Sequence, residues 1–327
     1  MMQKTQKAQS AELMQEYIAE VHRYSVRPDL DALYKAVSGA VQEDRQDQAQ
    51  VCGAMIWSAF ASPAGISYVF DVIADAQLGL PMSRNDCNVP CTPLPEEFWH
   101  AFVATVEGPE GGYDATSITV AVAALGGVLD ENYSGLSEAA AIAHPGADSP
   151  TAKTVPPLLA LKTLEVLPEG SLGRDLYSMW VDNGFDPEVL DRQAIGLDQM
   201  TPALRYLNTR ILQMHDVWHL AGGYQTTSLH EIAISSFQLA QFGHNYSAMF
   251  LATAATMSHV RTPQGFGLLM QNIAESWQHG RQAPSFMAIE WEEHWHKDIE
   301  TVRNELGISA FKGSFPADLL EQLAAGA

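Results

Sequence analysis

The amino-acid sequence predicts an all-α protein. Ala, Leu, Gln, Glu and Met are frequent, apolar residues recur every three or four positions, and strict alternation of apolar and polar residues is rare. Segment 117–129 (SITVAVAALGGVL) is the one stretch whose pattern would also suit a β-strand. The Asn183–Gly184 pair would suit a hairpin, but apolar residues at helical spacing across 172–180 favour a helix that stops at the glycine.

Composition and charge narrow the classes of partner. Of the 327 residues, 46% are hydrophobic and 17% are charged, which predicts a substantial core. The net charge of −21 would repel nucleic-acid phosphates, so nucleic-acid binding is not expected. It also offers no electrostatic attraction to anionic lipid, so any membrane contact has to be local and apolar.

The first half of the chain carries few signals of location or chemistry. Residues 1–15 are polar and resemble neither a secretory signal nor an Arg-rich transit peptide, and three cysteines suit free thiols in a reducing cytoplasm. The spacing of CNVPC at 87–91 is not a usual zinc pattern. Segment 51–70 is long and uncharged, but Pro63 and Gly65 interrupt it, which favours two buried helices joined by a turn over a membrane span.

Two segments rich in proline and turn residues, 79–97 and 144–157, are expected to be connectors. The second makes the better domain boundary, because all the residues with recognisable chemistry follow it. We therefore predict an N-terminal helical region of unknown role at 1–145. A bundle-like helical domain with the functional site is predicted at 146–327.

The strongest functional signal is a helix that carries two histidines. Apolar residues repeat at steps of three and four from 204 to 218, and His215 and His219 continue this stripe. At about 100° per residue, His215, Asp216 and His219 fall within an arc of roughly 100° and can point at one spot. These three side chains are therefore candidate metal ligands.

A glycine turn follows this helix and offers a fourth ligand. Gly222 and Gly223 are expected to end the helix, and the next helix would begin near Ser228 with Glu231 in its first turn. Such a helix–turn–helix can return Glu231 to the histidines. An alternative is a capping box, in which Glu231 only binds the backbone of Ser228. The sequence does not decide between these two roles for Glu231.

The four side chains have the chemistry of a divalent metal site. Two neutral imidazoles and two carboxylates around a divalent cation sum to zero charge, which suits a buried site. Nitrogen and oxygen ligands suit zinc, iron(II) or manganese, and the lack of thiolate argues against a purely structural zinc site. The pattern also approaches the His-Glu-x-x-His of zinc proteases, with Asp216 in the place of the glutamate.

The spacing His-Asp-x-x-His, eleven residues and then Glu resembles the signature of the coenzyme Q biosynthesis protein 4 family. Segments 167–185 and 286–308 also resemble the family, so the similarity covers roughly residues 150–310. This resemblance implies a mainly α-helical fold in which His215, Asp216, His219 and Glu231 hold a metal usually described as zinc. It implies the same four residues as the catalytic centre.

The resemblance also implies a function in ubiquinone biosynthesis. The implied reaction is oxidative decarboxylation of a polyprenylated hydroxybenzoate-type ring, with the C1 carboxylate replaced by hydroxyl, which makes the chain a decarboxylase of the lyase type. Because zinc has no redox chemistry, iron(II) is the alternative metal. Prenyl lipids and other pathway enzymes are the expected partners, and the expected location is the cytoplasm, peripherally at the inner membrane. Homo-oligomerisation stays open.

A second class of function is a non-catalytic, metal-stabilised scaffold that binds prenyl lipid and organises quinone-pathway enzymes, and a third is a metal-dependent hydrolase. The uncharged segment 232–260 is compatible with a prenyl tunnel, although a buried core helix is the simpler interpretation. Segment 290–298 (EWEEHWHKD) suits a solvated helix face with inward tryptophans better than a second metal site. Candidate residues for supporting the ligands or holding a substrate carboxylate are His230, His244, Arg174, Arg261 and Arg281.

Overall fold

The structure, a computed structural model, describes residues 14–144, 159–184 and 197–326. In these ranges the chain is helical and contains no strand, as predicted. Segment 117–129 lies mostly in the helix α6 (Ala115–Ala124) and the 3-10 helix that follows, so its strand alternative is wrong. Helix α9 (Leu172–Asn183) ends at Gly184, whose φ of 66° gives the left-handed C-cap that the Asn-Gly pair predicted.

The chain forms two compact units, and each is discontinuous in sequence. Unit 1 consists of residues 1–137 with 245–277, and unit 2 consists of 138–244 with 278–327. A contiguous division at 145/146 was predicted, whereas here 245–277 group with the N-terminal residues. Of the two expected connectors, 80–95 has no regular secondary structure, and 145–157 lie outside the described residues.

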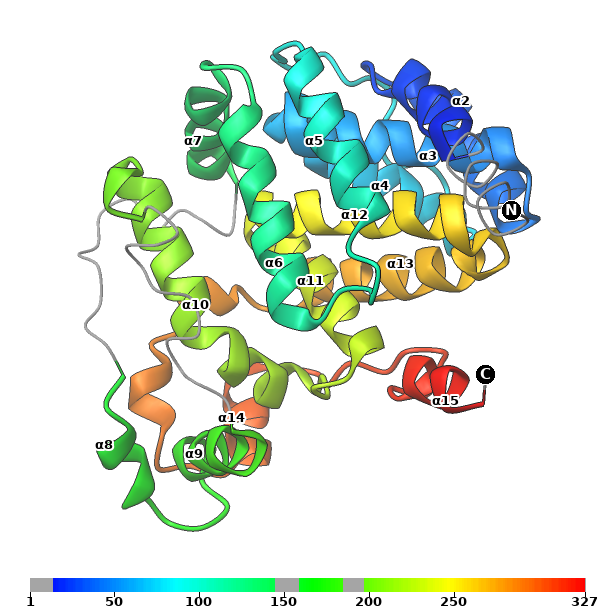
Figure 1. Cartoon of the computed structure of the whole chain (residues 1–327). Coiled ribbons are helices and arrows are strands. Elements are labelled where there is room, and N and C mark those ends of the chain that lie inside the picture. The colour runs from blue at the N-terminus through cyan, green and yellow to red at the C-terminus, as the bar shows by residue number, and fades with distance from the viewer. Residues whose placement is uncertain (1–13, 145–158, 185–196, 327) are drawn as a thin grey trace. The chain divides into compact units, whose positions relative to one another are not determined.

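Unit 1 is an assembly of helices. Its helices are residues 14–24, α2 (Leu30–Val41), α3 (Arg45–Ile56), α4 (Ile66–Gln77), α5 (Glu96–Glu107), α6, the start of α7 (Tyr133–Ala143), α12 (Asn245–Arg261) and most of α13 (Phe266–Gln282). Asp29 and Asp44 cap α2 and α3 by accepting backbone N–H groups. Helix α12 packs against α3, α5 and α6 (Figure 1).

The uncharged stretch 232–260 is divided between two helices by Gly243, a left-handed C-cap with φ 64°. Its second half is α12, in which Ala248, Leu251, Ala252 and Ala255 have no measurable exposure. Small residues on most sides let this helix approach its neighbours closely. Helix α12 is therefore a buried core helix of unit 1, which is the simpler of the two interpretations of this segment.

Segment 51–70 also lies in unit 1 and forms two buried helices with an irregular junction, as predicted. The end of α3 continues as a π-helical turn at Trp57–Ala61, and α4 begins after a short turn at Pro63–Gly65. In the described part of the chain, no helix has the length and hydropathy needed to cross a membrane. The three cysteines are free thiols, with Cys52 and Cys87 buried and Cys91 exposed.

Unit 2 holds every residue of the predicted metal motif. Its helices are α8 (Leu161–Glu165), α9, α10 (Pro202–Gly222), α11 (Ser228–Phe242), α14 (Ile299–Leu306) and α15 (Leu319–Ala325), with the ends of α7 and α13. The core contains Trp180, Trp218, Phe237, Phe286 and Trp291. Segment 290–298 is not an α-helix: Trp291–His294 is a short 3-10 helix, although Trp291 is fully buried as expected.

Burial leaves one histidine of unit 1 neutral. His259 on α12 is fully buried, and its Nδ1 lies 3.2 Å from Gln48 Oε1. Gln48 uses its amide nitrogen on the carbonyls of Ala40 and Pro263, so its oxygen faces the imidazole. Arg45 donates to the carbonyl of His259. Burial, assisted by the charge of Arg45, lowers the pKa of His259 to about 4.

This histidine should make the protein acid-sensitive. An unfolded chain protonates His259 below about pH 6.5, whereas the folded protein resists protonation down to about pH 4, so stability is lost as the pH falls between these values. The contribution of this residue should reach about 3 kcal/mol. Urea unfolding of the wild type and His259→Gln at pH 7 and pH 4 measures it. Parallel losses of stability in the two proteins would contradict the assignment.

Candidate metal centre

The candidate site is built where α10 gives way to α11. Helix α10 ends at Gly223, whose φ of 77° is left-handed, and the N–H of Tyr224 closes the turn on the carbonyl of His219 at 2.9 Å. The last carbonyls of α10 also have partners. Arg303 on α14 donates to the carbonyls of Leu220 and Ala221, and the N–H of Phe311 donates to Gly222. The helix terminus is therefore held by C-terminal segments of unit 2.

The two histidines and the aspartate converge as the helical spacing predicted. One ligand atom from each of His215, Asp216 and His219 lies within 4.8 Å of the others. The Nε2 atoms of the two imidazoles are 3.1 Å apart. His219 is almost completely buried, whereas His215 and Asp216 are partly exposed. The group is thus closed on the side of His219 and accessible on the side of His215.

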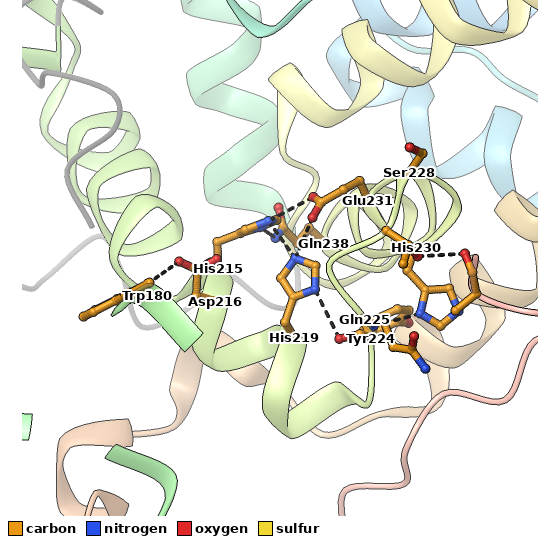
Figure 2. Close-up of polar contacts among 12 residues, drawn as sticks. Trp180, His215, Asp216, His219, Tyr224, Gln225, Ser228, His230, Glu231 and Gln238 are labelled. Atoms are coloured by element: carbon orange, nitrogen blue, oxygen red, sulfur yellow. Dashed lines mark hydrogen bonds and ion pairs between the residues drawn. The ribbon is translucent and has the colours of Figure 1, made fainter. Parts of the chain in front are cut away.

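Glu231 joins this group from the first turn of α11, as Figure 2 shows. Its Oε2 lies 3.4 Å from Nε2 of His215, and its Oε1 lies 3.3 Å from Nε2 of His219. The helix begins with Thr227 as N-cap and no side-chain cap, and the N–H of Ser228 donates to Glu321. Glu231 therefore does not form the capping box, because its carboxylate faces the histidines.

The electrostatics of the group follow from this contact. Burial raises the pKa of the Glu231 carboxyl, but hydrogen bonds and charge from His215 and His219 outweigh it and hold that pKa far below the usual range. Burial lowers the pKa of His215, but Glu231 and Asp216 reverse the effect and leave it raised. Glu231 is thus ionised throughout the physiological range, and the site attracts positive charge.

Three neighbouring groups orient three of the four side chains, and none of the three was predicted. The indole Nε1 of Trp180 on α9 donates to Asp216 Oδ2 at 2.6 Å. Nδ1 of His219 lies 3.3 Å from the carbonyl oxygen of Tyr224. Nδ1 of His215 lies 2.5 Å from Nε2 of Gln238. Only Gln238 had a detectable signal, because it follows Glu231 by seven residues and shares its face of α11.

The residues present fit a divalent cation. Nε2 of each imidazole faces the shared point while Nδ1 contacts a different partner, which is the usual arrangement of metal-binding histidines. Two carboxylates complete a set of two nitrogen and two oxygen donors with no net charge once a divalent ion is counted. The exposed side of Glu231 and His215 leaves room for a further ligand.

The other candidates lie outside this group. The ring of His230 turns the other way, packs against Phe311 and accepts the N–H of Gln225 at Nδ1 (Figure 2). His244 contacts Asn208, and burial together with the charge of His215 lowers its pKa to about 3. The three arginines donate to backbone carbonyls: Arg174 to Glu165, Arg261 to Val106 and Glu107, and Arg281 to Ala240.

This arrangement can be compared with known proteins. Residues 153–312, which include the whole group, match the family described as coenzyme Q (ubiquinone) biosynthesis protein Coq4. This part of the chain is therefore similar to the Coq4 family. The predicted resemblance, drawn for roughly 150–310, is confirmed with nearly the same bounds.

The relatives that this chain matches are named as ubiquinone biosynthesis proteins. The mouse ubiquinone biosynthesis protein COQ4 homolog, mitochondrial, is 30% identical over 151 residues, which are 46% of this chain and 55% of that protein. The human homolog is 30% identical over 155 residues, 46% of this chain and 56% of that protein. The chain thus spans about half the length of these curated relatives.

A solved structure is similar in fold to about two thirds of the chain. The crystal structure of a putative ubiquinone biosynthesis protein from Nostoc punctiforme superimposes with a TM-score of 0.51 at 20% identity. The match covers 66% of this chain and 98% of that one. At this level of identity the likeness concerns the helical fold alone.

The turn between α10 and α11 is sterically constrained. A Cβ atom on Gly223 would lie 2.8 Å from Cβ of Ala310, and the left-handed φ adds strain. We expect Gly223→Ala to cost about 1–2 kcal/mol in backbone strain and a further ~1 kcal/mol or more from overpacking. Gly307 has a φ of 69° with nothing within 4 Å, so Gly307→Ala should cost only the strain. Equal losses in chemical denaturation would disprove the close contact.

Proposed function

We propose that this chain acts in ubiquinone biosynthesis and replaces the C1 carboxylate of a polyprenylated hydroxybenzoate-type ring with hydroxyl. The observation that carries the proposal is the convergence of His215, Asp216, His219 and Glu231 within the part of the chain that is similar to the Coq4 family. Relatives of this part are named ubiquinone biosynthesis proteins. The proposed activity is that of a metal-dependent oxidative decarboxylase.

The four side chains would hold one divalent cation, which we propose to be zinc with iron(II) as the alternative. When bound, the cation supplies Lewis acidity to a ring or carboxylate oxygen, and iron would supply redox chemistry as well. Asp216 is held in position by Trp180, and His219 is fixed by burial and the Tyr224 carbonyl. The ring would enter from the half-exposed side formed by His215 and Glu231.

The proposed reaction is an oxidation, and dioxygen is the oxidant. Ring carboxylic acid, dioxygen and water give phenol, carbon dioxide and hydrogen peroxide. The bond from C1 to the carboxyl carbon breaks, a bond from C1 to oxygen forms, and the two electrons released reduce dioxygen. Glu231 is ionised at neutral pH, and its negative charge next to His215 favours a proton on Nε2 of that imidazole in the metal-free site.

Partners and location belong to the same proposal. A polyprenyl tail requires contact with lipid, and an acidic chain would make that contact through a local apolar surface at the periphery of a membrane. The resemblance to coenzyme Q biosynthesis proteins favours other enzymes of that pathway as protein partners. The curated relatives are described as mitochondrial, and peripheral association with an inner membrane is the proposal for this chain.

Metal content and turnover test the proposal together. Protein purified without chelator should contain about one zinc or iron per chain, and it should release carbon dioxide from a prenylated hydroxybenzoate in the presence of dioxygen. His219→Ala and Glu231→Gln should lose the metal or weaken its binding at least ~10-fold, since each removes a donor. His230→Gln is the matched control, because this buried histidine faces away from the group.

The outcomes separate the enzyme from its alternatives. Full activity of metal-depleted His219→Ala would contradict the proposal that the reaction depends on the metal. Stoichiometric metal with no turnover by the purified chain would favour the non-catalytic scaffold, in which the metal only stabilises unit 2. Direct metal analysis identifies the ion, and turnover supported by iron(II) but not by zinc would assign the redox role to the metal.

A further inference from the structure

The two histidines of the candidate metal centre differ in what contacts their second nitrogen. Nδ1 of His219 faces the carbonyl oxygen of Tyr224, which can only accept a hydrogen bond. His219 is therefore protonated on Nδ1, and its Nε2 keeps a lone pair. Nδ1 of His215 instead faces the side-chain amide of Gln238, which can donate through nitrogen or accept through oxygen.

Gln238 is placed to act on His215. It lies on α11, two helical turns after Glu231 and on the same face, so both side chains point at α10 (Figure 2). Gln238 is only 2% exposed, and its side-chain Nε2 lies 2.5 Å from Nδ1 of His215. A buried amide this close to an imidazole nitrogen must match the tautomer of the ring.

The amide orientation and the tautomer are coupled. With the amide nitrogen toward the ring, Gln238 donates to Nδ1, so the proton of His215 lies on Nε2 and faces Glu231 at 3.4 Å. That state suits the site without a cation, because Glu231 gains a hydrogen bond. A metal can bind Nε2 only through its lone pair. The proton of His215 must then lie on Nδ1, where it needs a hydrogen-bond acceptor.

A half-turn of the amide supplies that acceptor. Rotation about the last side-chain torsion of Gln238 exchanges its oxygen and nitrogen with little change in shape. We propose that Gln238 is a positioning residue that sets the tautomer of His215, and that its amide turns over when a divalent cation binds. This inference rests on the metal site of the proposed function. It predicts that cation affinity depends on a side chain that never touches the cation.

Zinc affinity tests the role of Gln238 directly. Competition with a chromophoric chelator should show 10- to 100-fold weaker zinc binding by Gln238→Leu, which has no acceptor for Nδ1, as expected on losing an outer-shell partner. Gln238→Glu offers a permanent acceptor and should bind zinc within about threefold of the wild type or more tightly.

Gln241→Leu is the matched control on the same helix. Gln241 is buried and hydrogen-bonds the carbonyls of Gly280 and Ala283 and the N–H of Phe286. Its replacement should lower stability and leave zinc affinity unchanged. Equal loss of affinity in Gln238→Leu and Gln241→Leu would mean that general destabilisation, and not positioning, explains the effect.

The tautomer itself is visible in the wild type without any variant. Nitrogen-15 NMR of the histidine rings should show His215 protonated on Nε2 without zinc and on Nδ1 with zinc, whereas His219 keeps its Nδ1 proton in both. His215 protonated on Nδ1 in both states would overturn the inference. Wild-type affinity in Gln238→Leu would overturn it and leave the proposed metal site intact. A wild type that binds neither zinc nor iron(II) would overturn both.

Discussion

The contact between Glu231 and the Nε2 atoms of His215 and His219 is the constraint on which the site depends. It joins the first turn of α11 to the last two turns of α10 across a turn of five residues. A carboxylate and two imidazoles are costly to bury unless they face one another or a cation. Contacts from the rest of unit 2 hold these three side chains close together.

That support comes from segments far away in the sequence. Arg303 and Phe311 bind the last carbonyls of α10, Tyr224 stacks on Phe311, and Trp180 holds Asp216. The contacts of Arg303, Trp180 and the Phe311 N–H satisfy polar groups at the helix end or at the site, where an unpaired buried group would lower stability. The resemblance to the Coq4 family on both sides of the motif has a physical counterpart here, because the flanking segments contribute these contacts.

The two halves of the chain have different relationships to known proteins. The family match begins at residue 153, whereas unit 1 is formed mostly from residues before it. Yet α12, which lies inside the match, is the buried helix against which α3, α5 and α6 pack. The lack of charge in residues 245–260 of α12 is therefore explained by burial in unit 1, and no lipid is needed to account for it.

The sequence by itself determined the helical class, the stop of α9 at Gly184, and the convergence of His215, Asp216 and His219, because helical periodicity and glycine capping are local. Only the tertiary structure decided where the carboxylate of Glu231 points. A capping box and a metal ligand require the same residue at the same spacing, and the difference lies in whether α11 turns its first carboxylate to its own backbone or to α10. The same reason hid the contact of Trp180 with Asp216, since a contact between two helices leaves no periodic pattern in the sequence.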